Sequence, residues 1–266
     1  MSTAAPDPMA IADLLIARRD SQRPLPVADV PGPLDHATAY QVQAAVAARR
    51  SERNGWRVAG YKIGATNPAA RAMLKIDQCF FGRLFDATNH DSPATLPAAP
   101  GFWHVYEPEI AIELSRDLPA TGAPFTPDDL RAATRAIMPV IEVVGTGYTP
   151  WTETGVPLLI ADNAIHGHLV MGRPVHDFAG FDLMELAVTL RINGVVAGTG
   201  RGGNVDGGPF GVAAWLANAL AAQGYALRAG DRITTGTTMP PPPIGSNQDV
   251  LADFGPLGQV SLRIGG

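Results

Sequence analysis

The apolar residues of the chain change from a helical to a strand-like pattern at about residue 56. A helical spacing begins at Ile11, and a second helical pattern covers residues 38–50 before Gly55, which suits a left-handed helix end. Period-two alternation dominates from then on. We therefore predict a helical N-terminal region over 1–55 and a mixed β domain over 56–266.

Strands are predicted from residue 56 and at 105–114, 140–144, 186–193, 232–235, 250–254 and 260–264. Short helices should begin near Asn67 and after Thr126, and a longer one should cover 212–223. Asn193 and Gly194 between two apolar runs indicate a hairpin turn. Strands and helices do not alternate strictly, so we predict an α+β fold with a mixed β-sheet rather than a doubly wound parallel sheet.

Composition narrows the function classes. The 266 residues are 46% hydrophobic and carry a net charge of -5, with no basic block, so a nucleic-acid partner is not expected. The apolar stretch near the N-terminus is short and broken by Asp13, so no membrane partner is expected either. Cys79 is the single cysteine, which excludes an internal disulfide and favours a reducing, cytoplasmic location.

The segment VYEPEIAIE carries the most informative charges. Period-two geometry places Glu107, Glu109 and Glu113 on one strand face. Carboxylates this close repel one another, and a hard cation such as Mg²⁺ or Mn²⁺ would relieve the repulsion through oxygen ligands. A solvated strand face is the alternative.

Two further charged residues sit in apolar surroundings. Glu142 interrupts IMPVIEVV and needs a partner, either a shared cation or a core hydrogen bond. Lys62 lies between Gly60 and Gly64 in GYKIG, where a ligand can approach the backbone, so Lys62 either binds a carboxylate and moves protons or extends to solvent. Asp77 is its candidate acid–base partner or a capping residue.

These residues belong to an ordered set of short motifs: GYKIG at 60–64, DQ at 77–78, FGRLF at 81–85, EPEIA at 107–111, Glu142, IADN at 160–163, GD at 230–231 and TG at 235–236. The set resembles the 2-keto-4-pentenoate hydratase and 4-oxalocrotonate decarboxylase family, within the fumarylacetoacetate hydrolase superfamily. The resemblance covers most of the chain.

The resemblance implies a β-roll core with a helical N-terminal part and a homo-oligomer. It implies that Mg²⁺ or Mn²⁺ is held by Glu107, Glu109 and Glu142, with Lys62 and Asp77 as catalytic residues. The substrate-binding residues it implies are Gly64, Leu84, Asp162, Asn163, Thr235, Gly236 and Thr237.

The function expected from the resemblance is a hydro-lyase that adds water to a 2-hydroxy-2,4-dienoate in the degradation of aromatic compounds. The alternatives are decarboxylation of a 2-oxo-3-enedioate, hydrolysis of a carbon–carbon bond, and a non-catalytic member that binds 2-oxo acids or supports a pathway enzyme as partner. The chain departs from the family at Ile165, where Ser is usual, and at 145–147, where Asp-Ser-Arg is usual. These departures leave the substrate within the family open.

Three other features carry less weight. GTGRGG at 198–203 matches a dinucleotide fingerprint but is not followed directly by a helix, so we predict a sharp turn there. His166 and His168 could ligate a metal from one strand face, but we expect them to be surface or packed residues. His104 supports only the carbon–carbon hydrolase alternative, and Cys79 is expected to be a core thiol.

Overall fold

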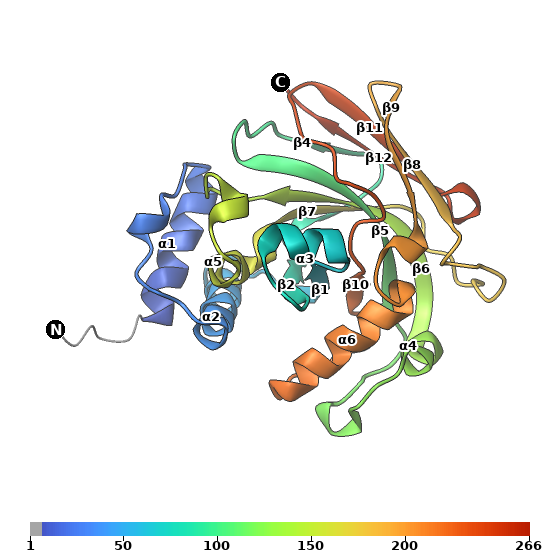
Figure 1. The fold of residues 1–266 in the computed structure, drawn as a ribbon, viewed down its shortest axis with the longest axis horizontal. Coiled ribbons are helices and arrows are strands. Elements are labelled where there is room, and N and C mark those ends of the chain that lie inside the picture. The colour runs from blue at the N-terminus through green and yellow to red at the C-terminus, as the bar shows by residue number, and fades with distance from the viewer. Residues whose placement is uncertain (1–6) are drawn as a thin grey trace.

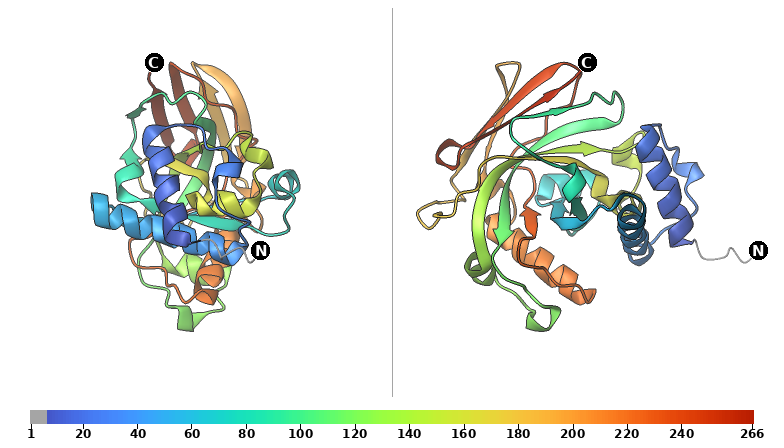
Figure 2. Two further views of the ribbon diagram at one scale, coloured as in Figure 1. Left: turned by 90° about the vertical axis from the view of Figure 1, so that its left-hand side faces the viewer. Right: turned by 180° about the vertical axis from the view of Figure 1, so that it is seen from behind.

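The computed structural model describes residues 7–266. Its N-terminal helices are α1 (Pro8–Ser21) and α2 (His36–Asn54), which pack against each other at one end of the molecule (Figures 1 and 2). Gly55 ends α2 in a left-handed conformation with φ 71°, as predicted. A third helix, α5 (Val156–Ala161), joins their apolar cluster.

A seven-stranded sheet curls through the centre of the molecule (Figure 1). Its strands, in spatial order, are β2 (Phe80–Phe85), β1 (Val58–Gly64), β10 (Arg232–Thr234), β5 (Trp103–Leu114), β6 (Thr134–Gly145), β7 (His166–Met171) and β3 (Asn89–Asp91). β1 runs parallel to β10 and β3 parallel to β7, and the other neighbours are antiparallel. The curl is strong enough for β2 to contact β7 across the sheet.

A second sheet has five strands, ordered β4 (Ala94–Leu96), β12 (Gln259–Ile264), β11 (Gln248–Asp253), β8 (Ala187–Ile192) and β9 (Val195–Arg201). Its strands β11 and β12 contact β6 of the central sheet. The turn between β8 and β9 is the predicted hairpin, with Asn193 at φ 50° and Gly194 at φ 80°.

Three further helices complete the fold: α3 (Pro68–Leu74), α4 (Pro127–Ala133) and α6 (Gly208–Ala222). α4 begins with a capping box in which Thr126 and Asp129 bond each other's backbone N–H groups. α6 packs against α4 below the central sheet (Figure 1). Apolar residues of α6, the outer face of β5 and the five-stranded sheet form the largest core.

The predicted α+β class with a mixed sheet and helical N-terminal part is confirmed. The turn predicted at GTGRGG is seen only at its end, where Gly202 and Gly203 begin the 3-10 turn Gly202–Asn204. Gly198 and Gly200 lie instead within β9, where a Cβ on Gly200 would come within 2.0 Å of the Thr238 carbonyl oxygen. The strands β2, β3, β4 and β7 and the helix α5 were not predicted.

The domain boundary at 55/56 stays a prediction. No helix in the described part of the chain is long and apolar enough to cross a membrane.

Candidate metal centre

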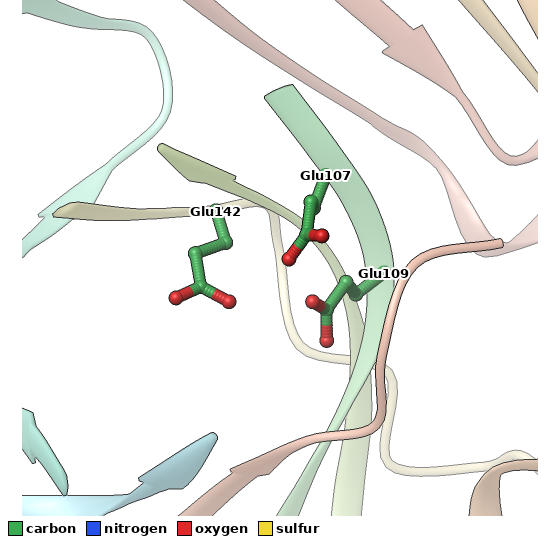
Figure 3. Close-up of side chains that lie close together, drawn as sticks. All are labelled: Glu107, Glu109 and Glu142. Carbon is green, nitrogen blue, oxygen red and sulfur yellow. The ribbon is translucent and has the colours of Figure 1, made fainter. Parts of the chain in front are cut away.

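Three acidic side chains converge on the inner face of the curled sheet (Figure 3). Glu107 on β5 is the direct cross-strand partner of Glu142 on β6, and Glu109 follows two positions along β5. One carboxylate oxygen from each of the three lies within 4.8 Å of the others. The period-two prediction for β5 and the expected approach of Glu142 are therefore both seen in the structure.

The oxygens of this cluster suit a hard cation. Glu109 and Glu142 are fully buried, and Glu109 Oε1 and Glu142 Oε2 have no hydrogen-bond partner among residues 7–266. Buried polar atoms are rarely left unpaired in proteins. Carboxylate oxygens are the ligands that Mg²⁺ and Mn²⁺ prefer, so the residues present fit a divalent metal.

The surroundings shift the pKa values of the three carboxyl groups in different directions. Burial raises the pKa of Glu107 to about 7, although the Lys62 ammonium opposes this shift. Burial, together with the Glu142 and Glu107 carboxylates, raises the pKa of Glu109 well above its usual range. Burial also opposes ionisation of Glu142, but Lys62 and His166 outweigh it and lower the pKa of Glu142.

Lys62 on β1 reaches this cluster from across the sheet. Its Nζ lies 3.4 Å from Glu142 Oε2 and 4.0 Å from Glu107 Oε2, and it donates a hydrogen bond to the Ala164 carbonyl at 3.4 Å. The side chain is 3% exposed, so the solvent-extended alternative is wrong. Burial alone would lower the pKa of Lys62, but the neighbouring carboxylates outweigh it and raise that pKa.

His166, expected as a surface or packed residue, is packed beside the acidic cluster, and its contact with Glu142 was not predicted. Its Nδ1 lies 2.8 Å from Glu142 Oε1, and the residue is buried. His168 instead contacts His90, with 3.0 Å between Nε2 of His90 and Nδ1 of His168. The two histidines do not share a strand face, because the register of β6 and β7 shifts at Gly167. The spacing of the two histidines in the chain does not reveal this bulge.

Glu113 is not part of the cluster although it lies on the same strand as Glu107 and Glu109. Its carboxylate forms ion pairs with Arg135 and with Arg232, whose Nε lies 3.4 Å from Glu113 Oε2. Its negative charge is therefore already compensated without a metal.

The other predicted site residues differ in what they contact. Gly236 donates its N–H to Glu109 Oε2 at 2.6 Å, and its φ of 96° together with the close approach of Thr66 allows only glycine there. Thr235 and Thr237 bind the backbone carbonyls of Ile110 and Met239, both at 2.8 Å. These contacts shape the wall of the site beside Glu109.

Leu84 belongs to an apolar group on the carboxylate side of the sheet, formed by Leu84, Ala111, Met138, Val140, Leu169 and Met171. Pairing places these side chains on the same face as the acids, since Leu169 is opposite Glu142 and Met171 is opposite Val140. Gly64 on β1 has no room for a side chain, because a Cβ would lie 2.8 Å from the Phe80 ring.

Asp162, Asn163 and Asp77 are placed differently. Both Asp162 oxygens are hydrogen-bonded, to Arg19 Nε at 2.5 Å and to Thr146 Oγ1 at 2.6 Å. Asn163 exchanges two hydrogen bonds of 2.8 Å with the backbone of Arg83. Asp77 is exposed in the turn between α3 and β2. The substrate-binding and acid–base roles of these three residues stay predictions.

Known sequences similar to this chain include a protein family and several hydratases. The sequence model of the fumarylacetoacetate (FAA) hydrolase C-terminal family matches residues 41–264. A 2-hydroxyhexa-2,4-dienoate hydratase of Comamonas testosteroni is 35% identical over 81% of this chain and 81% of that protein. A 2-keto-4-pentenoate hydratase of Burkholderia vietnamiensis is 36% identical over 85% of each chain.

Two solved structures have folds similar to that of this chain. The 4-oxalocrotonate decarboxylase of Pseudomonas putida G7, complexed with magnesium and adipate, superposes with a TM-score of 0.89 at 27% identity, covering 97% of both chains. A fumarylpyruvate hydrolase of Pseudomonas aeruginosa shares the fold at 13% identity, with a TM-score of 0.61 over 77% of this chain.

Proposed function

Because the chain belongs to the fumarylacetoacetate hydrolase family, we propose that it is a metal-dependent hydro-lyase that adds water to a 2-hydroxy-2,4-dienoate. The observation that carries the proposal is the convergence of Glu107, Glu109 and Glu142 with the buried Lys62. The hydratase relatives at 35–36% identity support the reaction type.

A divalent Mg²⁺ or Mn²⁺ held by Glu107, Glu109 and Glu142 would supply positive charge for the substrate's carboxylate and 2-oxygen, where negative charge develops. Magnesium is present in the complex of the decarboxylase neighbour, and manganese in that of the fumarylpyruvate hydrolase. The buried Glu109 Oε1, which has no hydrogen-bond partner among the described residues, supports the same assignment in this chain.

Lys62 is the candidate proton carrier. The carboxylates around it keep its amine protonated, so it starts as a proton donor. As the enol of the substrate loses its O–H proton, a proton must reach the far carbon of the diene. Water then adds its oxygen to the distal carbon of the remaining double bond and a proton to the neighbouring carbon, so the product gains one water. Asp77 is the proposed second proton carrier.

The apolar group beside the acids is suited to the hydrocarbon part of the substrate. Leu84, Leu169 and Met171 are buried on the same side of the sheet as Glu142. These side chains offer an uncharged tail no polar partner, whereas a second carboxylate placed beside them would need one.

Decarboxylation of a 2-oxo-3-enedioate is the second candidate, and it rests on the TM-score of 0.89 to the 4-oxalocrotonate decarboxylase. Carbon–carbon bond hydrolysis and a non-catalytic 2-oxo acid binder remain the further alternatives. We also propose, from the family resemblance, that the protein is a homo-oligomer and that a pathway enzyme is its partner. The single free Cys79 favours a cytoplasmic location.

To test this proposal, the ultraviolet absorbance of 2-hydroxypenta-2,4-dienoate is measured over time with purified protein, with and without Mg²⁺ or Mn²⁺. The mass of the product is determined by mass spectrometry. Metal-dependent loss of absorbance with a product heavier by one water is the expected result. If the dienoate is untouched while 4-oxalocrotonate loses carbon dioxide, the decarboxylase is correct. Metal binding without turnover of either substrate would leave the non-catalytic alternative.

A further inference from the structure

The turn between α5 and β7 has an unusual backbone. Asn163, Ala164 and Ile165 follow one another at φ 54°, 51° and 54°, all in the left-handed region. Residues with a side chain rarely adopt this region, and such a conformation persists only where the surrounding structure outweighs its cost. Three in succession therefore require strong external contacts.

This turn supplies two groups to the metal centre. The Ala164 carbonyl accepts the hydrogen bond from Lys62 Nζ at 3.4 Å, and His166 at the end of the turn contacts Glu142 Oε1 at 2.8 Å. The conformation of residues 162–166 thus sets the position of both the candidate proton carrier and one metal-ligating carboxylate. A residue that stabilises this turn therefore also stabilises the positions of Lys62 and Glu142.

Arg19 of α1 binds both ends of the turn with one guanidinium. Its Nε donates to Asp162 Oδ1 at 2.5 Å, Nη1 donates to the His166 carbonyl at 2.7 Å, and Nη2 donates to the carbonyls of Asp162 at 3.0 Å and Gly145 at 2.9 Å. The last of these residues ends β6, the strand of Glu142. The planar fork of arginine permits this set of contacts, which a single ammonium cannot reproduce.

The remaining contacts of the turn are arranged to complement Arg19. The Thr146 hydroxyl donates a hydrogen bond to Asp162 Oδ2, and the Asn163 side chain forms two hydrogen bonds with the backbone of Arg83 on β2. Asp162 is 3% exposed, so its carboxylate depends on Arg19 for charge compensation. Removal of Arg19 would leave a buried, unpaired charge at the start of the strained turn.

We propose that Arg19 is a positioning residue for the metal centre: it holds the turn 162–166 in the shape that sets Lys62 through the Ala164 carbonyl and Glu142 through His166. The inference rests on the proposed function of the site. Its consequence is that the N-terminal helical region takes part in building the site, although none of its side chains belongs to the Glu107, Glu109 and Glu142 cluster.

The test uses the full-length protein and needs no substrate. The sequence contains two lysines, the buried Lys62 and the exposed Lys75, so Lys75 is an internal reference. Brief treatment with acetic anhydride, followed by mass spectrometry, gives the ratio of acetylation at Lys62 to that at Lys75. Calorimetry gives the Mn²⁺ affinity of the same samples.

For Arg19→Met we expect the ratio to rise severalfold and the Mn²⁺ affinity to fall about tenfold, the range for loss of a group that orients a metal ligand. Arg19→Lys should give changes of the same sign but smaller size, and it keeps the proposal testable if the Met variant does not fold. An unchanged ratio and affinity in a folded Arg19 variant would overturn the proposal.

Arg50→Met is the matched control. Arg50 is a buried arginine that fastens α2 to α1 through Asp20 at 2.6 Å, and its hydrogen bonds do not involve residues 162–166. It should leave the ratio and the Mn²⁺ affinity near those of the unmodified protein. Equal changes in both variants would mean that Arg19 acts only through general docking of α1. Since neither measurement involves turnover, failure of the hydratase assignment is detected separately, in the dienoate assay.

Discussion

Glu107 on β5 and Glu142 on β6 are direct cross-strand partners, so two carboxylates face each other across adjacent hydrogen-bonded strands. Like charges in this arrangement destabilise a sheet. Lys62 offsets part of the repulsion at 4.0 Å and 3.4 Å, and a third carboxylate, Glu109, adds to it. The site therefore favours additional positive charge, which is the physical basis of the predictions below.

Glu109→Gln should abolish measurable Mg²⁺ and Mn²⁺ binding while leaving the fold intact. The amide keeps the shape of the side chain but removes one anionic ligand. Because burial already raises the pKa of Glu109 well above its usual range, the melting temperature of the metal-free variant should be no lower than that of the unmodified protein. Calorimetric titration and thermal unfolding check both points, with Glu185→Gln on the surface as control. Unchanged metal affinity would remove Glu109 from the ligand set.

Lys62→Met should retain metal binding and lose turnover by about 10²–10⁴-fold, the usual contribution of a positioned acid or base. The three carboxylates proposed as ligands remain in this variant, so Mn²⁺ titration should still show a site. Lys75→Met, at an exposed position, serves as control and should keep full activity. A fully active Lys62 variant would exclude this residue from proton transfer.

His166→Phe should weaken metal binding about tenfold, since loss of an orienting hydrogen bond to a ligand has effects of this size. The imidazole Nδ1 lies 2.8 Å from Glu142 Oε1, and phenylalanine leaves that oxygen without a partner. His166→Gln, which retains an N–H donor, should restore part of the affinity. If both variants bind Mn²⁺ as the unmodified protein does, Glu142 needs no orienting partner.

The stabilisation of the protein by metal should grow with pH. Burial raises the pKa of Glu107 to about 7. A carboxyl group with a raised folded-state pKa contributes stability while it is protonated, and this stability is lost as the pH rises through that pKa. The metal-free protein should therefore lose stability between about pH 4.5, where the unfolded chain ionises, and about pH 7, where the folded protein does, whereas bound metal compensates the new charge.

The measurement is the increase in melting temperature on addition of Mg²⁺ at these two pH values. It should be larger at the higher pH, because fewer protons compete with the metal for the same oxygens. In Glu107→Gln the part of the pH dependence that comes from this carboxyl group should disappear. An increase that is larger at the lower pH would contradict the assignment of Glu107 as a ligand.

Local sequence patterns were sufficient to predict those parts of the site whose geometry is set within a single strand. Period-two alternation placed Glu107 and Glu109 together, and the isolated charges of Lys62 and Glu142 in apolar runs indicated buried partners. The hairpin at Asn193 and Gly194 was predicted for the same reason, since its turn geometry depends on two adjacent residues.

Tertiary structure decided the rest. The bulge at Gly167 separates His166 from His168, Arg135 and Arg232 withdraw Glu113 from the acidic cluster, and Arg19 reaches the turn 162–166 from the first helix. Each of these depends on register or contact between segments far apart in the chain. Alternation along one strand assigns residues to the same side of that strand, and it can be read from local sequence because it is a property of the backbone. Which of those sides meet depends on the curl and pairing of the sheet, because register is set between strands that are far apart in the chain.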